Sequence, residues 1–225
     1  MTQVVPAIIP QTREQLEEEI KRLSKFANLL QIDISDGIFT PTKTWPYNAH
    51  DIQFFNDLKT QEIGWPQWQD VEFEIHLMVK FPENVVLDWI NTGASTIIAH
   101  IEATENFQKV IDICRMHSVS VGIAIKPGTD IERLAPFAWQ VDFIQVMGSD
   151  LLGKHNVPLD PKAIDKIREL HVLYPERIIG IDIGVMEDTA EILVKAGATK
   201  LISGGAILEA GNPEEVYKKL QVASI

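Results

Sequence analysis

Four polar side chains interrupt stretches of the sequence that otherwise have the apolar composition of buried strands. Gln31 and Asp33 lie two residues apart in one such stretch, so they share one face of an extended chain. His76 and Asp182 stand alone in two later stretches. Two carboxylates, an imidazole and an amide oxygen that meet at one place need a positive partner between them. We therefore predict a divalent metal site formed by Gln31, Asp33, His76 and Asp182.

Each of these residues also has a purely structural interpretation. The carboxylate of Asp33 is compatible with capping the turn that follows it at Asp36-Gly37. A single histidine in a strand, such as His76 or His100, is often a hydrogen-bonded core residue. The prediction of a shared site therefore depends on three strands that offer metal-compatible side chains together, and not on any one residue.

The elements that must position these residues alternate between strands and helices. Apolar stretches predict strands over residues 4–9, 29–39, 71–79, 94–100, 119–125, 141–147, 177–184 and 200–203. Helical spacing predicts helices over residues 11–27, 51–58, 82–92, 105–117, 130–137, 161–174, 186–196 and 213–220. Eight strand-then-helix units predict a (β/α)8 TIM barrel that forms a single domain over residues 1–225. The first turn, residues 8–11, lacks the glycine-rich motif of a dinucleotide-binding open sheet.

Glycines follow the last two predicted strands, at the end of the barrel where the chemistry of this fold is carried out. Gly184 follows the seventh strand, and Gly204 and Gly205 follow the eighth. Their backbone N–H groups can approach a phosphate at this position of a barrel. Glycine pairs are also ordinary turn residues.

The composition of the 225-residue chain restricts its partners. The formal net charge of -12 argues against nucleic acid and anionic membranes, because both bind clusters of Lys and Arg. A small sugar phosphate remains compatible with this charge, since backbone N–H groups can hold it. The single cysteine, Cys114, permits no internal disulfide. The first residues have no signal-peptide pattern and no apolar stretch approaches the roughly 20 residues of a membrane helix, so we expect a cytoplasmic protein.

Six short motifs follow one another along the chain. They are IDISDG at 32–37, EIHLM at 74–78, IAIKPGT at 123–129, VM at 146–147, DIGV at 182–185 and SGGAI at 203–207. With these motifs in this order, the chain resembles the ribulose-phosphate 3-epimerase family over nearly its whole length. The resemblance implies a TIM barrel of the ribulose-phosphate-binding type and a divalent metal ion, with Zn, Mn, Fe and Mg as candidates.

The resemblance also implies roles for individual residues. Asp33 and Asp182 match the two aspartates of the family that flank the metal, and His76 matches a metal ligand. Met78 and Met147 match methionines that line the reacting part of the substrate. The implied reaction converts ribulose 5-phosphate to xylulose 5-phosphate by a two-base 1,1-proton transfer through an enediolate, with Asp33 and Asp182 as the acid and base.

Several positions depart from the pattern of the family. Gln31 stands where the family usually has a metal-binding histidine, Ala7 where it has serine, Ile183 where it has glycine, and Gly205 where it often has serine. Residues 149–155 replace a glycine-rich loop that covers the substrate. Lys154 and His155 in this segment can supply charge for a phosphate, or can belong to a mobile, solvated loop. An altered sugar substrate is therefore one interpretation of these changes.

Two other function classes remain open from the sequence. A barrel without the usual loop can bind a sugar phosphate, or a protein, without catalysis. Lys126 can form a Schiff base in a lyase, although the resemblance gives it a role in closing a loop before Pro127. We expect residues 45–47 to form an exposed apolar loop that is compatible with a homo-oligomer.

Overall fold

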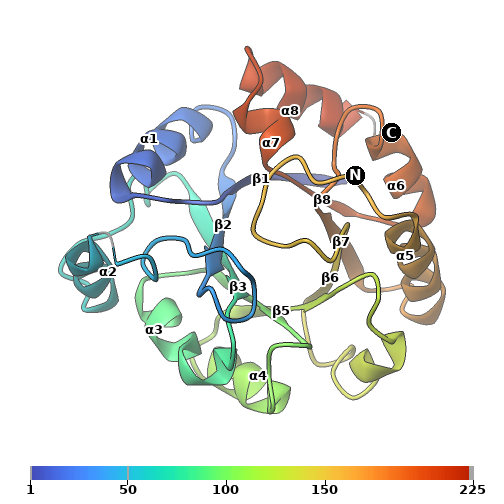
Figure 1. Cartoon of the computed structure of the whole chain (residues 1–225), viewed down its shortest axis with the longest axis horizontal. Helices are drawn as coiled ribbons and strands as arrows, with labels where there is room; N and C mark the ends of the chain where they lie inside the picture. Colours follow the sequence, from blue (N-terminus) through green and yellow to red (C-terminus); the bar gives the residue numbers. More distant parts are fainter. Residues whose placement is uncertain (1, 50, 223–225) are drawn as a thin grey trace.

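Eight parallel strands close into one barrel in the computed structural model, which describes residues 2–49 and 51–222. Each strand pairs with the next, and the last pairs with the first (Figure 1). The strands are β1 Gln3–Ile8, β2 Leu29–Ser35, β3 Glu72–Met78, β4 Thr96–His100, β5 Ser120–Ile125, β6 Phe143–Met147, β7 Ile178–Asp182 and β8 Lys200–Ser203. The predicted (β/α)8 TIM barrel is confirmed.

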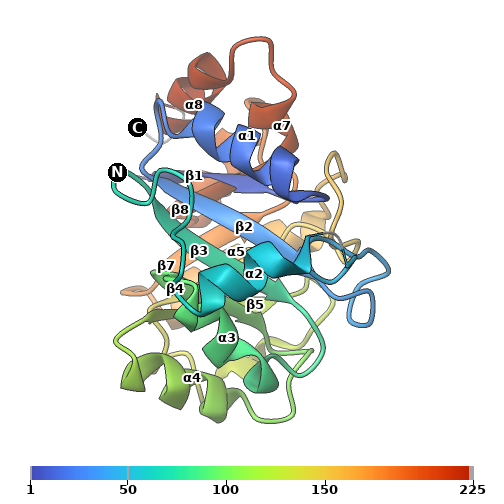
Figure 2. The same cartoon turned by 90° about the vertical axis from the view of Figure 1, so that its left-hand side faces the viewer.

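Helices surround the strands and run against their outer faces (Figure 2). They are α1 Arg13–Leu23, α2 Ile52–Lys59, α3 Val86–Asn91, α4 Phe107–Met116, α5 Pro161–Leu173, α6 Ala190–Ala196, α7 Gly205–Leu208 and α8 Pro213–Val222. Local capping explains several of their starts: the side chains of Thr12, Asn106 and Asp160 accept backbone N–H groups at the first turns of α1, α4 and α5. No helix in the described ranges combines the length and apolar character needed to cross a membrane.

Two predicted helices were wrong in detail. The helix expected over 130–137 is only a 3-10 turn, η2 Ile131–Leu134, because Pro136 follows and has no N–H to continue a helix. The helix expected over 82–92 is divided into η1 Pro82–Asn84 and α3 at Val85, whose φ of -120° is not helical. After β8, Gly205 begins the short helix α7.

The alternation of side chains along the strands explains how polar residues occur in apolar stretches. On β2, Leu30, Ile32 and Ile34 belong to the large core that includes helix residues such as Leu16 and Ile20. The residues between them, including Gln31 and Asp33, must then point to the opposite face, which is the interior of the barrel. One face of each strand is therefore free to carry the chemistry.

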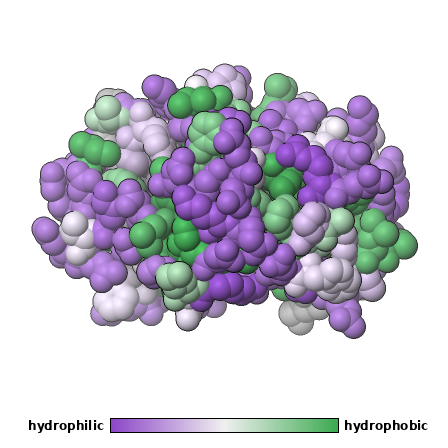
Figure 3. All heavy atoms as spheres, turned by 90° about the horizontal axis from the view of Figure 1, so that it is seen from below, coloured by the Kyte–Doolittle hydropathy of each residue, from purple (hydrophilic) through white to green (hydrophobic). Residues whose placement is uncertain are grey.

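The long segment between β2 and α2 is packed by aromatic side chains. Trp45 is fully buried, and its ring lies 5.6 Å from that of Phe54 and 6.1 Å from that of Trp65. The expectation that residues 45–47 offer an exposed apolar surface for oligomerisation was therefore wrong for Trp45. On the face shown in Figure 3, hydrophobic side chains form separate patches within a mostly hydrophilic surface.

Candidate active site and metal centre

The barrel register brings the predicted acidic residues to one level of the interior. Asp33 on β2 is opposite His76 on β3, and Asp182 on β7 is opposite Met147 on β6. The exposed fractions of Asp33, His76 and Asp182 are 5%, 0% and 6%. All three residues stand at or close to the C-terminal ends of their strands, where TIM barrels carry out their chemistry.

Asp33, His76 and Asp182 form a cluster suited to a metal ion. One potential ligand atom from each residue lies within 4.8 Å of the others. His76 Nδ1 lies 3.0 Å from Asp33 Oδ1 and 3.4 Å from Asp182 Oδ2. Two carboxylates and one imidazole nitrogen that converge in this way are a common donor set for divalent metals. The structure thus brings together three of the four residues predicted to bind metal with their donor atoms directed to one point.

Gln31 is the fourth predicted ligand, and its amide nitrogen faces the cluster. Gln31 Nε2 donates to Asp33 Oδ1 at 2.8 Å and to Asp182 Oδ2 at 3.1 Å. Its oxygen, Oε1, is buried and has no hydrogen-bond partner among the described residues. Rotation of the terminal amide exchanges its nitrogen and oxygen, which turns this unpartnered acceptor toward the carboxylates. A cation between the carboxylates would satisfy that oxygen, so the donor set fits a metal ion.

Burial and proximity determine the proton affinities in the cluster. Burial raises the pKa of Asp33, and the neighbouring Asp182 carboxylate raises it further. Burial alone would lower the pKa of His76, but contacts with Asp182 and Asp33 outweigh it and raise the pKa to about 9. Without a metal ion, a proton on His76 therefore provides the positive charge between the carboxylates.

His76 also begins a hydrogen-bonded series that leads away from the carboxylates. Its Nε2 lies 3.0 Å from Nε2 of His100 on β4, and His100 Nδ1 lies 3.2 Å from Glu102 Oε2. Burial and the adjacent His76 lower the pKa of His100 to about 4. Burial alone would raise the pKa of Glu102, but contacts led by its hydrogen bond to His100 lower it to about 2. The sequence prediction considered His100 only as a single histidine and did not identify Glu102.

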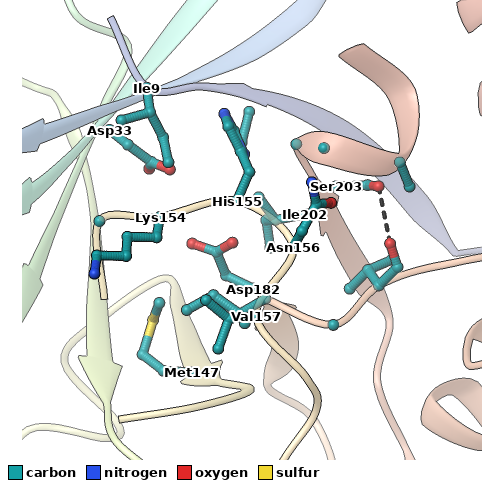
Figure 4. A pocket seen from close by; sticks show the side chains of 18 of the residues that line it. Ile9, Asp33, Met147, Lys154, His155, Asn156, Val157, Asp182, Ile202 and Ser203 are labelled. Atoms are coloured by element: carbon teal, nitrogen blue, oxygen red, sulfur yellow. Dashed lines mark hydrogen bonds between the residues drawn. The ribbon is translucent and has the colours of Figure 1, made fainter. Parts of the chain in front are cut away.

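A cavity at the mouth of the barrel contains the remaining predicted site residues. Asp33 and Asp182 point into this cavity toward each other, and Met147 lies beside them (Figure 4). Its lining also includes Ala7, Met78, Gly184, Gly204 and Gly205. All nine residues of the predicted catalytic, metal-binding and substrate-binding set thus lie in or beside one site, with Gln31 and His76 placed by their contacts with Asp33.

The segment between β6 and α5 crosses over the end of the barrel (Figure 1). Lys154, His155 and Asn156 in this segment line the cavity (Figure 4). The imidazole of His155 packs so closely on Gly204 that a Cβ there would lie 2.7 Å from its Nδ1. A side chain at position 204 would therefore displace His155, which explains the need for glycine at this contact.

One residue near Asp182, Gln145, had a signal in the sequence that was not recognised. Gln145 is fully buried on β6, and its Nε2 donates to Asp182 Oδ2 at 3.3 Å. It stands two residues before Met147 on the same strand face, so the alternation of β6 was sufficient to find it. Ile183 has a φ of 77°, a conformation that is strained for a β-branched residue and explains why glycine is usual there.

Lys126, the alternative nucleophile, lies apart from the acidic cluster. Its Nζ is 4.4 Å from the centre of the Phe39 ring, and its backbone N–H donates to Glu102 Oε1 at 2.8 Å. Among the described residues it is not part of the lining shared by Asp33 and Asp182. The geometry therefore directs attention to the carboxylates rather than to a lysine adduct.

Comparison with known proteins identifies the family of this chain. The model of the Ribulose-phosphate 3 epimerase family matches residues 3–208. The ribulose-phosphate 3-epimerase of Schizosaccharomyces pombe is 29% identical over 219 residues, which cover 97% of this chain and 92% of that protein. The Chlamydia muridarum enzyme of the same name is 32% identical over 183 residues, covering 79% of this chain and 75% of that protein.

A solved structure shows the same fold at much lower identity. The 3-hexulose-6-phosphate synthase of Salmonella typhimurium aligns with a TM-score of 0.72 and 14% identity over 100% of this chain and 98% of that chain. This likeness concerns the barrel alone. The family match over nearly the whole chain establishes that this protein belongs to the ribulose-phosphate 3-epimerase family, a family of carbohydrate isomerases.

Proposed function

We propose that this single-domain barrel is a metal-dependent epimerase that interconverts ribulose 5-phosphate and xylulose 5-phosphate. The observation that carries the proposal is the pair Asp33 and Asp182, which extend from different strands into one buried cavity. Inversion at a carbon beside a ketone requires removal of a proton on one face and delivery of a proton on the other. Two carboxylates on separate strands can act on the two faces.

The environment of the two aspartates supports opposite roles for them. One aspartate must accept a proton while the other donates one. Burial raises the pKa of Asp33, and the neighbouring Asp182 carboxylate raises it further. The neighbouring Asp182 carboxylate therefore increases the affinity of Asp33 for a proton. Gln145 donates an N–H to Asp182 Oδ2, and this contact holds the carboxylate toward the cavity.

The ligands of the proposed metal ion are Asp33, His76, Asp182 and the oxygen of Gln31. A bound divalent ion would act as a Lewis acid and stabilise negative charge that develops on the substrate, a contribution of several kcal/mol. Met78 and Met147 provide an apolar wall that does not compete for protons. The neutral amide of Gln31 is a weaker donor than the usual imidazole, so we expect a lower affinity for zinc than in relatives with histidine there.

Three glycines in the lining of the cavity support the proposal that the substrate carries a phosphate group. Gly184, Gly204 and Gly205 follow β7 and β8, the position at which TIM barrels usually hold phosphate. Lys154 and His155 lie over the same cavity and can add positive charge. The sequence left open whether Lys154 and His155 contact a phosphate or belong to a solvated loop. Their position in the lining of the cavity supports the phosphate contact.

Hydrogen exchange tests the proposal directly. We expect the protein with added manganese or zinc to introduce deuterium at carbon 3 of ribulose 5-phosphate in deuterated water, as seen by proton NMR. The exchange should disappear in Asp33→Asn and remain in Asp165→Asn, because Asp165 is an exposed residue of α5.

Each alternative outcome has a defined meaning. Exchange that continues in Asp33→Asn would contradict the acid and base roles. Exchange with a different ketose phosphate, and none with ribulose 5-phosphate, would replace the substrate but keep the reaction. No exchange across a panel of ketose phosphates would overturn the proposed activity in favour of a binding protein.

A further inference from the structure

A chain of hydrogen bonds connects the candidate metal ligand His76 to the rim of the barrel. The backbone N–H of Lys126 donates to Glu102 Oε1 at 2.8 Å. The other carboxylate oxygen lies 3.2 Å from His100 Nδ1, and His100 Nε2 lies 3.0 Å from His76 Nε2. Both imidazoles are fully buried, so water cannot replace a missing partner at either ring.

Only one assignment of protons satisfies every link in this chain. An ionised carboxylate can only accept, so His100 must carry its proton on Nδ1 and donate it to Glu102. A neutral His100 then has a lone pair on Nε2, and this atom must accept a proton from His76 Nε2. When His76 is neutral, its remaining nitrogen, Nδ1, is therefore the one with a free lone pair.

The orientation of His76 gives this assignment a purpose. Nδ1 is the nitrogen that faces the two aspartates, at 3.0 Å from Asp33 Oδ1 and 3.4 Å from Asp182 Oδ2. The opposite tautomer would put a proton on Nδ1 and leave two lone pairs facing each other between His76 and His100. Such an arrangement would lose a buried hydrogen bond and would block the metal site.

We propose that His100 and Glu102 are positioning residues that fix His76 in the tautomer able to bind a metal ion through Nδ1. Carboxylate and imidazole groups behind a metal-binding histidine commonly set its tautomer and raise its basicity. In this protein two successive hydrogen bonds produce this effect: one joins Glu102 to His100, and the next joins His100 to His76. The inference rests on the proposed metal site, but it does not depend on the identity of the sugar.

Metal affinity in a matched pair of variants tests this inference. Glu102→Gln should weaken the binding of zinc or manganese by about 10- to 100-fold, measured by competition with a chromogenic chelator. Glu83→Gln is the control. Glu83 is also a buried carboxylate, and it lies in the η1 segment. It accepts hydrogen bonds from Thr104 Oγ1 at 2.8 Å and from the Glu105 N–H at 3.0 Å, but among the described residues it makes no hydrogen bond to the series of His76, His100 and Glu102.

Two substitutions of His100 separate positioning from folding. The amide of His100→Gln can accept from His76 and donate to Glu102, so this variant should retain most of the metal affinity. His100→Leu fills the space but makes neither hydrogen bond, and its affinity should fall as far as that of Glu102→Gln. Urea unfolding of each variant shows whether the protein remains folded when the affinity is measured.

Nitrogen NMR of the zinc-loaded protein observes the tautomer itself. We expect His76 to carry a proton on Nε2 and to coordinate zinc through Nδ1, and His100 to carry its proton on Nδ1. Coordination through Nε2 of His76, or equal metal affinity in folded Glu102→Gln and Glu83→Gln, would overturn the inference.

The same measurements distinguish this inference from the proposed function. Tight metal binding without deuterium exchange would reject the epimerase activity and leave the roles of His100 and Glu102 intact. A wild-type protein that binds neither zinc nor manganese would reject both the metal site and the positioning roles.

Discussion

The interior of the barrel contains two buried groups of charged residues that differ in their balance. Glu74 on β3 and Lys200 on β8 form an ion pair at 2.6 Å, and their side chains are 1% and 5% exposed. Two residues further along β3, His76 lies between the carboxylates of Asp33 and Asp182. The first group has one charge of each sign. The second has two acids for one imidazole and two nearby amide oxygens without a partner, those of Gln31 and Gln145.

This difference teaches that burial of charge does not by itself identify a functional site. Glu74 and Lys200 balance each other in charge, although Glu74 Oε1 has no hydrogen-bond partner among the described residues. Lys200 Nζ also lies 4.0 Å from the centre of the Phe143 ring. The cluster around His76 is incomplete unless a proton or a cation joins it. An unequal number of acidic and basic groups that converge on one point is the feature that indicates a ligand.

The largest expected effect is the loss of turnover when the incomplete cluster loses one carboxylate. Asp182→Asn should reduce the rate of deuterium exchange by about 10²- to 10⁴-fold, the usual contribution of a general acid or base. Its free energy of unfolding should remain equal or increase, because the substitution removes one of two like charges. Urea unfolding measured beside the exchange rate checks both parts, and a less stable variant would contradict this account of the cluster.

The ion pair should respond in the opposite way. Lys200→Met leaves the carboxylate of Glu74 buried without its partner, and should lower the free energy of unfolding by about 3–5 kcal/mol. The double variant Glu74→Leu with Lys200→Met should recover most of this loss, because no uncompensated charge remains. A loss below about 1 kcal/mol in the single variant, the value of an exposed pair, would show that the pair does not support the barrel.

Metal ions should stabilise one group and leave the other unchanged. Manganese at about 100 times its dissociation constant should add about 2.7 kcal/mol to the free energy of unfolding. The same gain should appear in Lys200→Met and should be absent in Asp33→Asn. Thermal unfolding with manganese and with a chelator measures the difference, and an equal gain in all three proteins would place the metal elsewhere.

Stability at low pH should depend on Glu102, which is hydrogen-bonded to His100, and not on Glu74 of the ion pair. The pKa of Glu102 is lowered from 4.5 to about 2, so its stabilising contribution is present above pH 4.5 and is lost as the pH falls toward 2. Burial raises the pKa of Glu74, so its protonation does not cause such a loss. Glu102→Gln should therefore flatten the fall in urea midpoint below pH 4.5, whereas Glu74→Gln should leave that slope in place.

Both the order of the strands and the acidic cluster could be predicted from the pattern of apolar stretches in the sequence. Asp33, His76 and Asp182 are isolated polar residues in otherwise apolar strands, and the ends of parallel strands must meet at one mouth. The ion pair was not recognised, because Glu74 in the first half of β3 and Lys200 at the start of β8 lie away from the C-terminal strand ends that carry the chemistry of this fold. Only the closed barrel brings them together, across 126 positions of sequence.

The loops were less predictable, because their conformation depends on contacts between distant segments. The position of His155 is fixed by its packing on Gly204, and neither local sequence indicates the other. The burial of Trp45 likewise requires Phe54, Trp65 and Trp89, which come from three different segments. Composition identified these segments as polar or aromatic, but it did not specify which surfaces they would cover.

The pairing of Glu74 with Lys200 has a consequence for how the chain folds during synthesis. Strand β8 is the last to be translated, and it must pair with both β7 and β1 before the barrel closes. Until then the carboxylate of Glu74 has no ammonium partner and must remain hydrated, so this end of the interior stays wet. The barrel therefore closes late in folding, and the loss of water from its interior and the formation of the ion pair accompany this closure. The event depends on contacts between residues far apart in the sequence.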